Sequence, residues 1–271
     1  MSQTPKEINM KKSRFHRAFV AIVMIIMSWS SITAYDFVVD GIYYNILNHN
    51  EAEVTHYYTY PDRDYKGYVG NVIIPNKVVY DGTTYNITAI GVDAFTQSES
   101  MTGVQIPNSV TSIGDEAFSY CTSLTSIVIP NRVTSIGKRA FLNCTALTSV
   151  VWNAVKCSDN KVSHSPFDGC SNLTSILFGD NVEHIPANLC YGLSSLTGFE
   201  IPNSVTSIGN RAFYGCNSLM SIIVETGNPK YDSREGCNAI LETASNTLVL
   251  GCKNSKIPNS VISIGNCAFE S

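Results

Sequence analysis

Apolar and polar residues alternate over two short stretches that recur along most of the chain. In the segment 129–152 these stretches are VTSI, which begins at Val133, and LTSVVW, which begins at Leu147. Alternation with a period of two is typical of short β-strands that bury one face. We therefore predict two strands in this segment, with their apolar side chains pointing into a core.

Two residues predict the corners between these strands. Pro130 has no N–H for a sheet ladder and favours an extended residue before it, so it ends one strand. Gly137 follows the other strand and can adopt positive φ without steric cost. The segment KRAFLNC (138–144) is predicted to form a short helical turn with its apolar residues inward. One such segment is thus one turn of a coil.

The same pattern repeats with a fixed spacing. The nine letters IPNSVTSIG occur at 106–114 and 201–209, and with one changed letter at 129–137 and 257–265. Units begin at equivalent positions: Ile74, Ile106, Ile129, Trp152, Phe178, Ile201, Val224 and Ile257. The commonest interval between them is 23 residues, and the longer intervals hold insertions. Because one unit buries too little to fold alone, we predict that residues 74–271 form a stack of 23-residue turns.

Stacking places equivalent residues of successive turns above one another, about 4.8 Å apart. Phenylalanines at one position are predicted to form a buried ladder: Phe95, Phe118, Phe141, Phe167, Phe213 and Phe269. Cysteines share another position: Cys121, Cys144, Cys170 and Cys216. Leu193 occupies the cysteine position of its own unit, so this column is predicted to consist of small buried apolar groups without disulfides.

Several segments depart from the repeat. Residues 35–73 lack it, and their alternating pattern and many tyrosines predict a β-rich segment that caps the open end of the stack. A hairpin is predicted near 78–87, turning at Asp81-Gly82. The unit that begins at Ile257 stops before its cysteine position, so the last repeat is expected to be incomplete.

A second hairpin is predicted near 230–255, centred on Ala244-Ser245. In that register Cys237 and Cys252 face each other, and a cross-strand disulfide between them is geometrically reasonable. Two unpaired thiols are the alternative, and the sequence leaves both open.

The full pattern, L-x-x-I-x-I-P-x-x-V-x-x-I-G-x-x-A-F-x-x-C, closely resembles the treponemal-type, BspA-like leucine-rich repeats. The opening segment YDFVVDGIYYNI (35–46) also resembles the β-rich start of exported members of that family. The resemblance implies a leucine-rich-repeat solenoid, mostly β with short helical turns, whose L-x-x-I-x-I strands form a parallel sheet. It also implies adhesion or partner binding outside the cell instead of catalysis, with extracellular-matrix or host-cell proteins as partners.

The first 34 residues are predicted to be a signal peptide that exports the chain. A basic start is followed by the apolar run AFVAIVMIIM (18–27), which is too short to span a membrane, and cleavage is expected after Ala34. We therefore expect a secreted or cell-surface protein with no stable membrane insertion after cleavage. Removing 1–34 leaves 13 Lys and Arg against 21 Asp and Glu, a net charge of −8. That sign is wrong for a nucleic-acid binder.

The outward residues of the predicted parallel sheet form two columns. One column is small: Gly103, Ser126, Ser149, Ser175, Gly198 and Ser221. The other contains three consecutive aliphatic residues: Gln105, Val128, Val151, Leu177, Glu200 and Ile223. Such a flat apolar strip suits an extended peptide or the face of a glycan, because successive residues lie about 4.8 Å apart. The alternative is β-propensity alone, since valine and leucine favour strands even when exposed.

Metal and catalytic chemistry have little support in the sequence. The irregular stretch 152–177 and its neighbours hold candidate zinc ligands: Cys157, His164, Asp168, Cys170, His184 and Cys190. They lack the ligand spacings of zinc sites, and Ser163, His164 and Asp168 are too close in sequence for a triad. We therefore expect no metal, no cofactor and no catalytic residue.

The leading interpretation is a non-enzymatic binding scaffold or adhesin for an extracellular or host protein, or for a glycan. One alternative is a structural spacer within a larger surface protein. Another is a polysaccharide-acting enzyme of the β-helix type, although such enzymes need clustered charged residues and the outward columns offer only Glu200.

Overall fold

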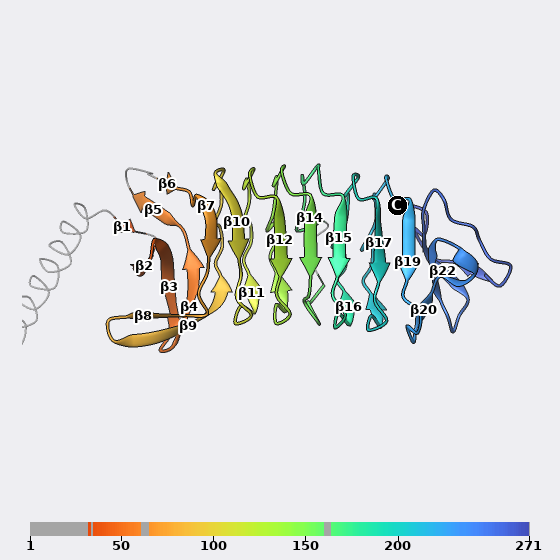
Figure 1. Ribbon diagram of the computed structural model, residues 1–271, viewed down its shortest axis with the longest axis horizontal. Coiled ribbons are helices and arrows are strands. Elements are labelled where there is room, and N and C mark those ends of the chain that lie inside the picture. The colour runs from red at the N-terminus through yellow and green to blue at the C-terminus, as the bar shows by residue number, and fades with distance from the viewer. Residues whose placement is uncertain (1–31, 34, 61–64, 160–163, 271) are drawn as a thin grey trace, which may run out of the picture.

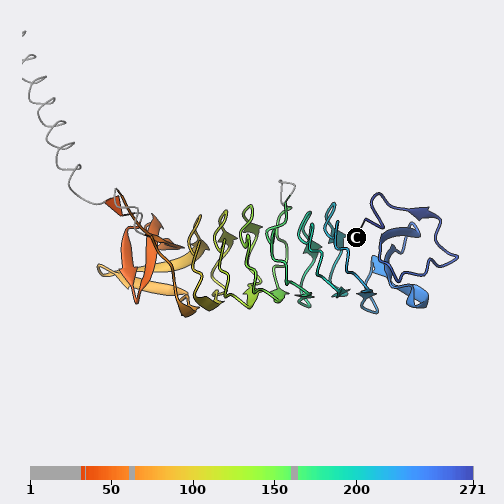
Figure 2. The ribbon, with the colours of Figure 1, turned by 90° about the horizontal axis from the view of Figure 1, so that it is seen from above.

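The computed structural model describes residues 32–33, 35–60, 65–159 and 164–270, and the side chains of 32–33 and 58–66 are not described. Apart from Ile32 and Thr33, the predicted signal peptide lies outside these residues. The molecule is elongated, with successive turns of the chain side by side along its long axis (Figures 1 and 2). Within the described residues, no helix is both long and apolar enough to cross a bilayer.

The N-terminal end consists of antiparallel strands that lead into the stack. The strands are β1 (Ile32–Thr33), β2 (Phe37–Val39), β3 (Ile42–Asn48), β4 (Glu51–Thr55), β5 (Tyr57–Tyr60), β6 (Tyr65–Lys66), β8 (Lys77–Tyr80) and β9 (Thr83–Ile90). Strands β2, β3 and β4 pair antiparallel, and β4 then pairs parallel to β9. Strands β8 and β9 form a hairpin in which Asp81 and Gly82 both have positive φ, as a type I′ turn requires.

One long face of the stack is a parallel sheet with one strand from each turn. It comprises β12 (Ser126–Ile129), β14 (Ser149–Trp152), β15 (Ser175–Phe178), β17 (Gly198–Ile201) and β19 (Ser221–Val224) (Figure 1). Upstream, β10 (Met101–Gln105) pairs parallel to β7 (Gly70–Ile73). Ser126 pairs with Ser149, and Ser149 with Ser175, so equivalent letters of successive units share one level. The predicted stack of equivalent turns is confirmed.

The VTSI stretches form a second row of shorter strands. These are β11 (Ser112–Ile113) and β13 (Ser135–Ile136), which extend from the end of β9, and β16 (His184–Ile185) with β18 (Ser207–Ile208). The irregular stretch of the unit 152–177 interrupts the row between β13 and β16. Backbone hydrogen bonds still connect the irregular stretch to the repeats on both sides. Ser158 N–H donates to Thr134 O before it, and Glu183 N–H, after it, donates to Val155 O.

The segment predicted as a short helical turn forms tight turns instead. Arg139 and Asn143 both have positive φ, and a left-handed residue cannot continue a right-handed helix. Some backbone N–H groups of this segment bond within it, as Cys121 N–H donates to Phe118 O. Others bond to the next repeat, as Phe118 N–H donates to Ala140 O at 2.6 Å. The only helical element in the described chain is the 3-10 helix η1 (Arg234–Gly236).

The predicted phenylalanine ladder forms over its first four members and then ends. Phe95, Phe118, Phe141 and Phe167 stack with ring centroids 4.8, 4.9 and 5.1 Å apart. Cys190 occupies the next position and offers no ring. Phe213 therefore stacks on Phe199 of the parallel sheet, with centroids 4.0 Å apart.

The prediction that Phe269 is buried is wrong, because its side chain is 45% exposed. Its ring lies against Gly251, where an added Cβ would meet ring atoms of Phe269. Its unit, which contains β23 (Ser263–Ile264), follows an irregular segment made of β20 (Tyr231–Asp232), β21 (Ala239–Glu242) and β22 (Thr247–Gly251). Strands β21 and β22 form an antiparallel hairpin, and β22 pairs parallel to β23.

Candidate functional site

The predicted outward column of the parallel sheet lies on exposed strand positions. Val128 pairs in register with Val151, and Val151 with Leu177. Val128 is 51% exposed and Leu177 59%, with Val151 half-buried between them. We call these three residues the aliphatic row. Glu200 interrupts the column, and Ile223, 48% exposed, resumes it as the register partner of Glu200.

Small residues flank the aliphatic row. Ser126 and Ser175 are exposed, and Ser149 is half-buried. At Gly198 an added Cβ would lie 2.7 Å from the carbonyl oxygen of Ser221, so the close approach of two strands requires glycine there. The surface beside the aliphatic row is therefore flat and presents backbone and hydroxyl groups. Gln105, on β10, is exposed at the upstream end of the same column.

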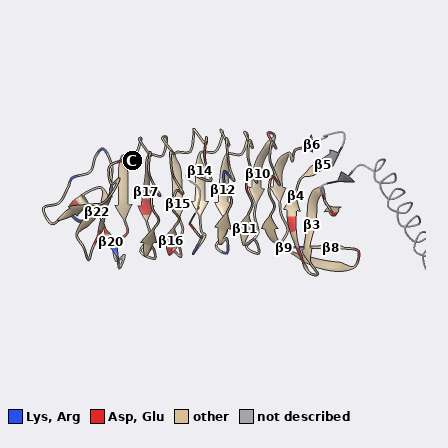
Figure 3. Cartoon of the chain, turned by 180° about the vertical axis from the view of Figure 1, so that it is seen from behind, with Lys and Arg blue, Asp and Glu red and all other residues tan. Residues whose placement is uncertain are grey.

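Charged residues avoid this sheet. Among β12, β14, β15, β17 and β19, the one charged residue is Glu200, and Figure 3 shows it as an acidic segment on β17. The aliphatic row is thus an apolar contact surface with one fixed charge, Glu200, at its downstream end. A partner that binds there would be recognised by shape, by apolar contact and by hydrogen bonds to the serine hydroxyls.

The structure brings together a serine, a histidine and an aspartate that lie far apart in the sequence. His184 Nδ1 lies 2.7 Å from Ser207 Oγ, and His184 Nε2 lies 2.8 Å from Asp159 Oδ1. His184 and Ser207 are register partners in β16 and β18, 23 residues apart in adjacent turns. The period of the repeat was the signal that could have found this pair. Asp159 comes from the irregular stretch, where no period applies.

This cluster has the composition of a catalytic triad, but the backbone amides of Ser207 and Gly209 are not free to bind an oxyanion. Ser207 N–H donates to Glu183 O, and Gly209 N–H donates to Ile185 O, so these backbone amides are committed to holding the turns together. An acyl-transfer site needs free donors at that place for the oxyanion. The arrangement acts as a polar link between turns, and Ala187 N–H completes it with a hydrogen bond to Asp159 Oδ1 at 2.7 Å.

The contacts of Asp159 with Ala187 and His184 predict that the stability of the protein depends on pH. The hydrogen bond from Ala187 N–H, followed by the contact with His184, lowers the pKa of Asp159. Because the unfolded-state pKa is higher, about 3.9, this stabilisation is present above that pH and is lost as the pH falls through the folded-state value. Asp159→Asn should therefore be less stable than wild type at pH 7 in urea unfolding. The difference should vanish towards pH ~2, and a gap that is constant with pH would contradict this origin.

The residues considered as candidate zinc ligands are not gathered into one cluster in the described part of the chain. Within the described ranges, no group of three or more His, Cys, Asp and Glu side chains is placed to hold a metal ion. Asp168 instead contacts Arg139 Nε at 3.2 Å, and its Oδ2 lies 3.9 Å from His164 Nδ1. Ser163, the third residue of the triad considered from sequence, lies outside the described residues.

The cysteine column is buried, as predicted, and its thiols also make hydrogen bonds. Each Sγ lies 3.1 Å from a carbonyl oxygen one turn earlier: Cys121 to Phe95, Cys144 to Phe118, Cys170 to Phe141 and Cys216 to Cys190. Burial raises the pKa of Cys216 to about 12, so its thiol is protonated and unreactive at neutral pH.

Cys237 and Cys252 are free thiols in the structure. The hairpin begins in the predicted register, with Glu242 opposite Thr247, but a shift between Ile240 and Leu241 moves the pairing by one residue. Asn238 therefore lies beside Cys252, with Asn238 Nδ2 3.3 Å from Cys252 Sγ. The bulge is the physical reason why the two cysteines do not face each other.

Counting thiols tests this register. We expect all nine cysteines to be alkylated when the unreduced protein is denatured and analysed by mass spectrometry, because all nine are free in the structure. Seven alkylated cysteines, with a linked peptide that contains Cys237 and Cys252, would show that the bulge is absent and that the disulfide forms.

Comparisons with known proteins agree with this architecture. Six copies of a family described as BspA type leucine rich repeat region match residues 88–220. No curated protein matches the sequence significantly. A leucine rich cell surface protein from Faecalibacterium prausnitzii is 24% identical, with a TM-score of 0.52 over 89% of this chain and 74% of that chain. The pneumococcal vaccine antigen PcpA is 15% identical, with a TM-score of 0.55 over 88% of this chain and 61% of that chain.

At these identities the two solved structures show a shared fold and nothing more. The family match adds the repeat type, and its residues coincide with the turns that carry the phenylalanine ladder and the parallel sheet. Residues 88–220 are therefore a BspA-type leucine-rich repeat region, and the chain is a BspA-like leucine-rich repeat protein.

Proposed function

We propose that this protein is a non-enzymatic binding scaffold, exported through residues 1–34, that captures a protein or glycan partner at or outside the cell surface. The observation that carries the proposal is the aliphatic row, in which Val128 and Leu177 are exposed and Val151 is half-buried, all in register on neighbouring strands. An extended chain laid across these strands meets one side chain about every 4.8 Å. The serine column beside the row supplies hydroxyls to the same partner.

The test is a triple substitution, Val128→Ser, Val151→Ser and Leu177→Ser. Outward positions contribute little to the core, so the variant should fold like wild type while its capture of a partner falls at least ~10-fold, since each lost apolar contact removes about 1 kcal/mol. Binding is measured against a panel of purified extracellular-matrix proteins and against a glycan array. Capture equal to wild type would contradict the proposal.

A matched control removes exposed aliphatic residues elsewhere. Val79, Val92 and Ile262 are exposed outside the parallel sheet. Changing these three to serine alters the surface hydrophobicity by a similar amount, and partner capture should stay unchanged. Equal losses in both triple variants would mean that general surface stickiness, not the aliphatic row, binds the partner.

The elongated shape supports a second candidate, a structural spacer (Figure 1). A spacer needs no partner on the parallel sheet, so the wild-type protein would bind nothing in either panel. A polysaccharide-degradation assay tests the enzymatic alternative, for which the parallel sheet offers one carboxylate, Glu200.

A further inference from the structure

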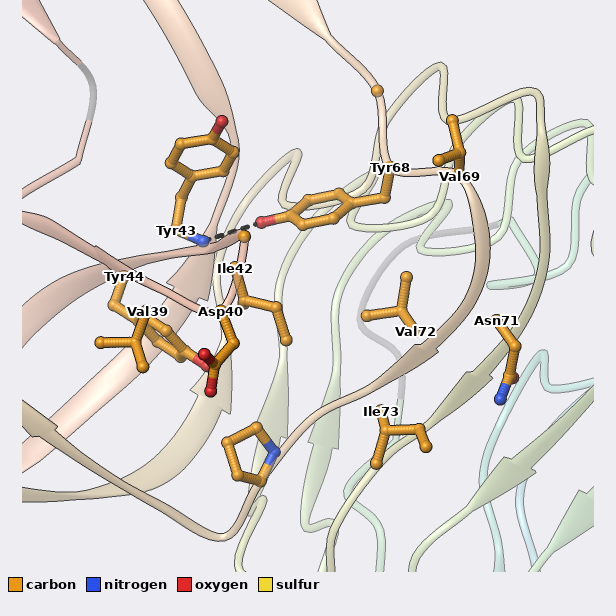
Figure 4. Close-up of a pocket in the computed structure, with 13 residues that line it drawn as sticks. Val39, Asp40, Ile42, Tyr43, Tyr44, Tyr68, Val69, Asn71, Val72 and Ile73 are labelled. Carbon is orange, nitrogen blue, oxygen red and sulfur yellow. Dashed lines mark hydrogen bonds between the residues drawn. The ribbon is translucent and has the colours of Figure 1, made fainter.

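A cavity of about 480 Å³ lies at the N-terminal end of the molecule, away from the aliphatic row. It forms where the turn between β2 and β3 meets the segment 67–75 that enters the stack (Figure 4). This volume suits a small organic molecule or one long side chain of a partner. Aromatic rings of Tyr43, Tyr44 and Tyr68 line it, and Val69 and Ile73, 72% and 60% exposed, border it.

The electrostatics of the cavity favour a cation. Among the described residues that line it, Asp40 is the one charged side chain. Asp40 and Gly41 both have positive φ, so a tight Asp-Gly turn fixes the position of the carboxylate. Figure 4 shows the Asp40 carboxylate next to the hydroxyl end of Tyr44. An anionic ligand would be repelled there, whereas a cation gains a charge-assisted hydrogen bond.

The hydroxyl of Tyr44 gives a second, independent indication. The Tyr44 side chain is fully buried, and its hydroxyl has no hydrogen-bond partner in the described structure. Burial, and then the negative charge of Asp40, raise the pKa of Tyr44, so the hydroxyl stays protonated. A buried polar group without a partner is destabilising, and a donor bound in the cavity would remove that penalty.

The neighbouring tyrosine is satisfied and holds the aromatic wall in place. Tyr68 Oη donates to Thr55 O at 2.7 Å and accepts a hydrogen bond from Tyr43 N–H at 3.1 Å. The Tyr68 ring also packs on Phe95, the first ring of the ladder, with centroids 4.6 Å apart. Tyr68 therefore forms a wall of the cavity that is anchored to the core. The Tyr44 hydroxyl, by contrast, is buried there without a hydrogen-bond partner.

We propose that this cavity binds an organic cation, an ammonium, amidinium or guanidinium group on an apolar stem. The cation lies at Asp40 and donates a hydrogen bond to Tyr44 Oη, and the stem packs among the tyrosine rings and Val72. The same chemistry describes a free amine and a lysine or arginine side chain of a polypeptide. The site is independent of the aliphatic row, so either can fail without the other.

The test uses benzamidine and its neutral isostere benzamide, titrated into the whole chain by calorimetry. We expect benzamidine to bind with a dissociation constant in the millimolar range or below, and benzamide to bind at least ~10-fold more weakly. Asp40→Asn keeps the shape of the turn, since asparagine tolerates positive φ, and should weaken benzamidine at least ~10-fold. Tyr44→Phe should fold normally and weaken benzamidine by a smaller factor.

The chain offers a matched control. Asp81 opens a second Asp-Gly turn with positive φ, between β8 and β9, and does not line the cavity. Asp81→Asn should leave benzamidine binding unchanged. Equal affinity for benzamidine and benzamide, no binding of benzamidine, or equal behaviour of the Asp40 and Asp81 variants would each overturn the proposal.

Two further ligands distinguish the sources of the cation. Agmatine represents a free amine, and the peptide acetyl-Val-Arg-Val-amide represents an arginine side chain flanked by residues that contact the exposed Val69 and Ile73. Tighter binding of the peptide identifies a polypeptide partner, and tighter binding of agmatine identifies a free amine. Both arms should lose affinity in Asp40→Asn, and an arm that does not would be binding elsewhere.

Discussion

Phe118→Ala should destabilise the protein by about 3–5 kcal/mol, among the largest effects of any single substitution in the core. The Phe118 ring is fully buried between Phe95 and Phe141, with centroid separations of 4.8 and 4.9 Å. Removing it loses the transfer free energy of the ring and leaves a cavity between two flat neighbours that cannot close together. Chemical unfolding followed by circular dichroism measures the loss.

The matched control is Leu177→Ala, which truncates an aliphatic residue that faces outward from the parallel sheet. It should change the free energy of unfolding by no more than about 0.5 kcal/mol. A loss below ~1 kcal/mol for Phe118→Ala would show that the ring is not enclosed between turns, and would contradict the ladder.

Gly114→Ala is expected to cost about 3 kcal/mol, because there is no room for a side chain between two turns. An added Cβ at Gly114 would lie 2.6 Å from Val92 N and 2.7 Å from Gly91 C, atoms of the preceding turn. Backbone atoms cannot rotate away as a side chain can, so the turns must separate. The sequence suggested that the glycine of SIG allows positive φ, but Gly137 and Gly114 do not adopt it. Glycine is needed there for close approach of backbones.

The last copy of the motif supplies the control for this prediction. At Gly265 the nearest atom to an added Cβ is the carbonyl oxygen of Leu248, at 3.1 Å. Gly265 occupies the same position of the repeat as Gly114. Gly265→Ala should lower the free energy of unfolding clearly less than Gly114→Ala. If both variants lost the same free energy of unfolding, the loss would come from the general effect of replacing glycine by alanine. Contact between adjacent turns would then not be its cause.

The periodic part of the fold could be predicted from the sequence because its letters repeat. Recurrence of Ser126, Ser149 and Ser175 at equivalent positions fixed which residues share a level, and the structure has that register. The same logic placed Val128, Val151 and Leu177 in one outward row. Both are consequences of a side-chain period of two within strands and a period of 23 between them.

Features that break the period were missed or misplaced. Asp159 joins His184 and Ser207 from an irregular stretch, where spacing in sequence says nothing about position. The bulge between Ile240 and Leu241 shifts the register of the hairpin by one residue, and no residue type in that hairpin predicts it. The cavity beside Tyr44 likewise depends on how two non-repeating segments meet.

A crystal structure of the protein tests the central claim, that successive 23-residue segments are equivalent turns of one stack. The account predicts the ring of Phe118 stacked between Phe95 and Phe141 at about 5 Å on each side. It also predicts Val128, Val151 and Leu177 side by side on adjacent parallel strands. Phenylalanine rings in unrelated environments, or strands paired out of this register, would contradict it.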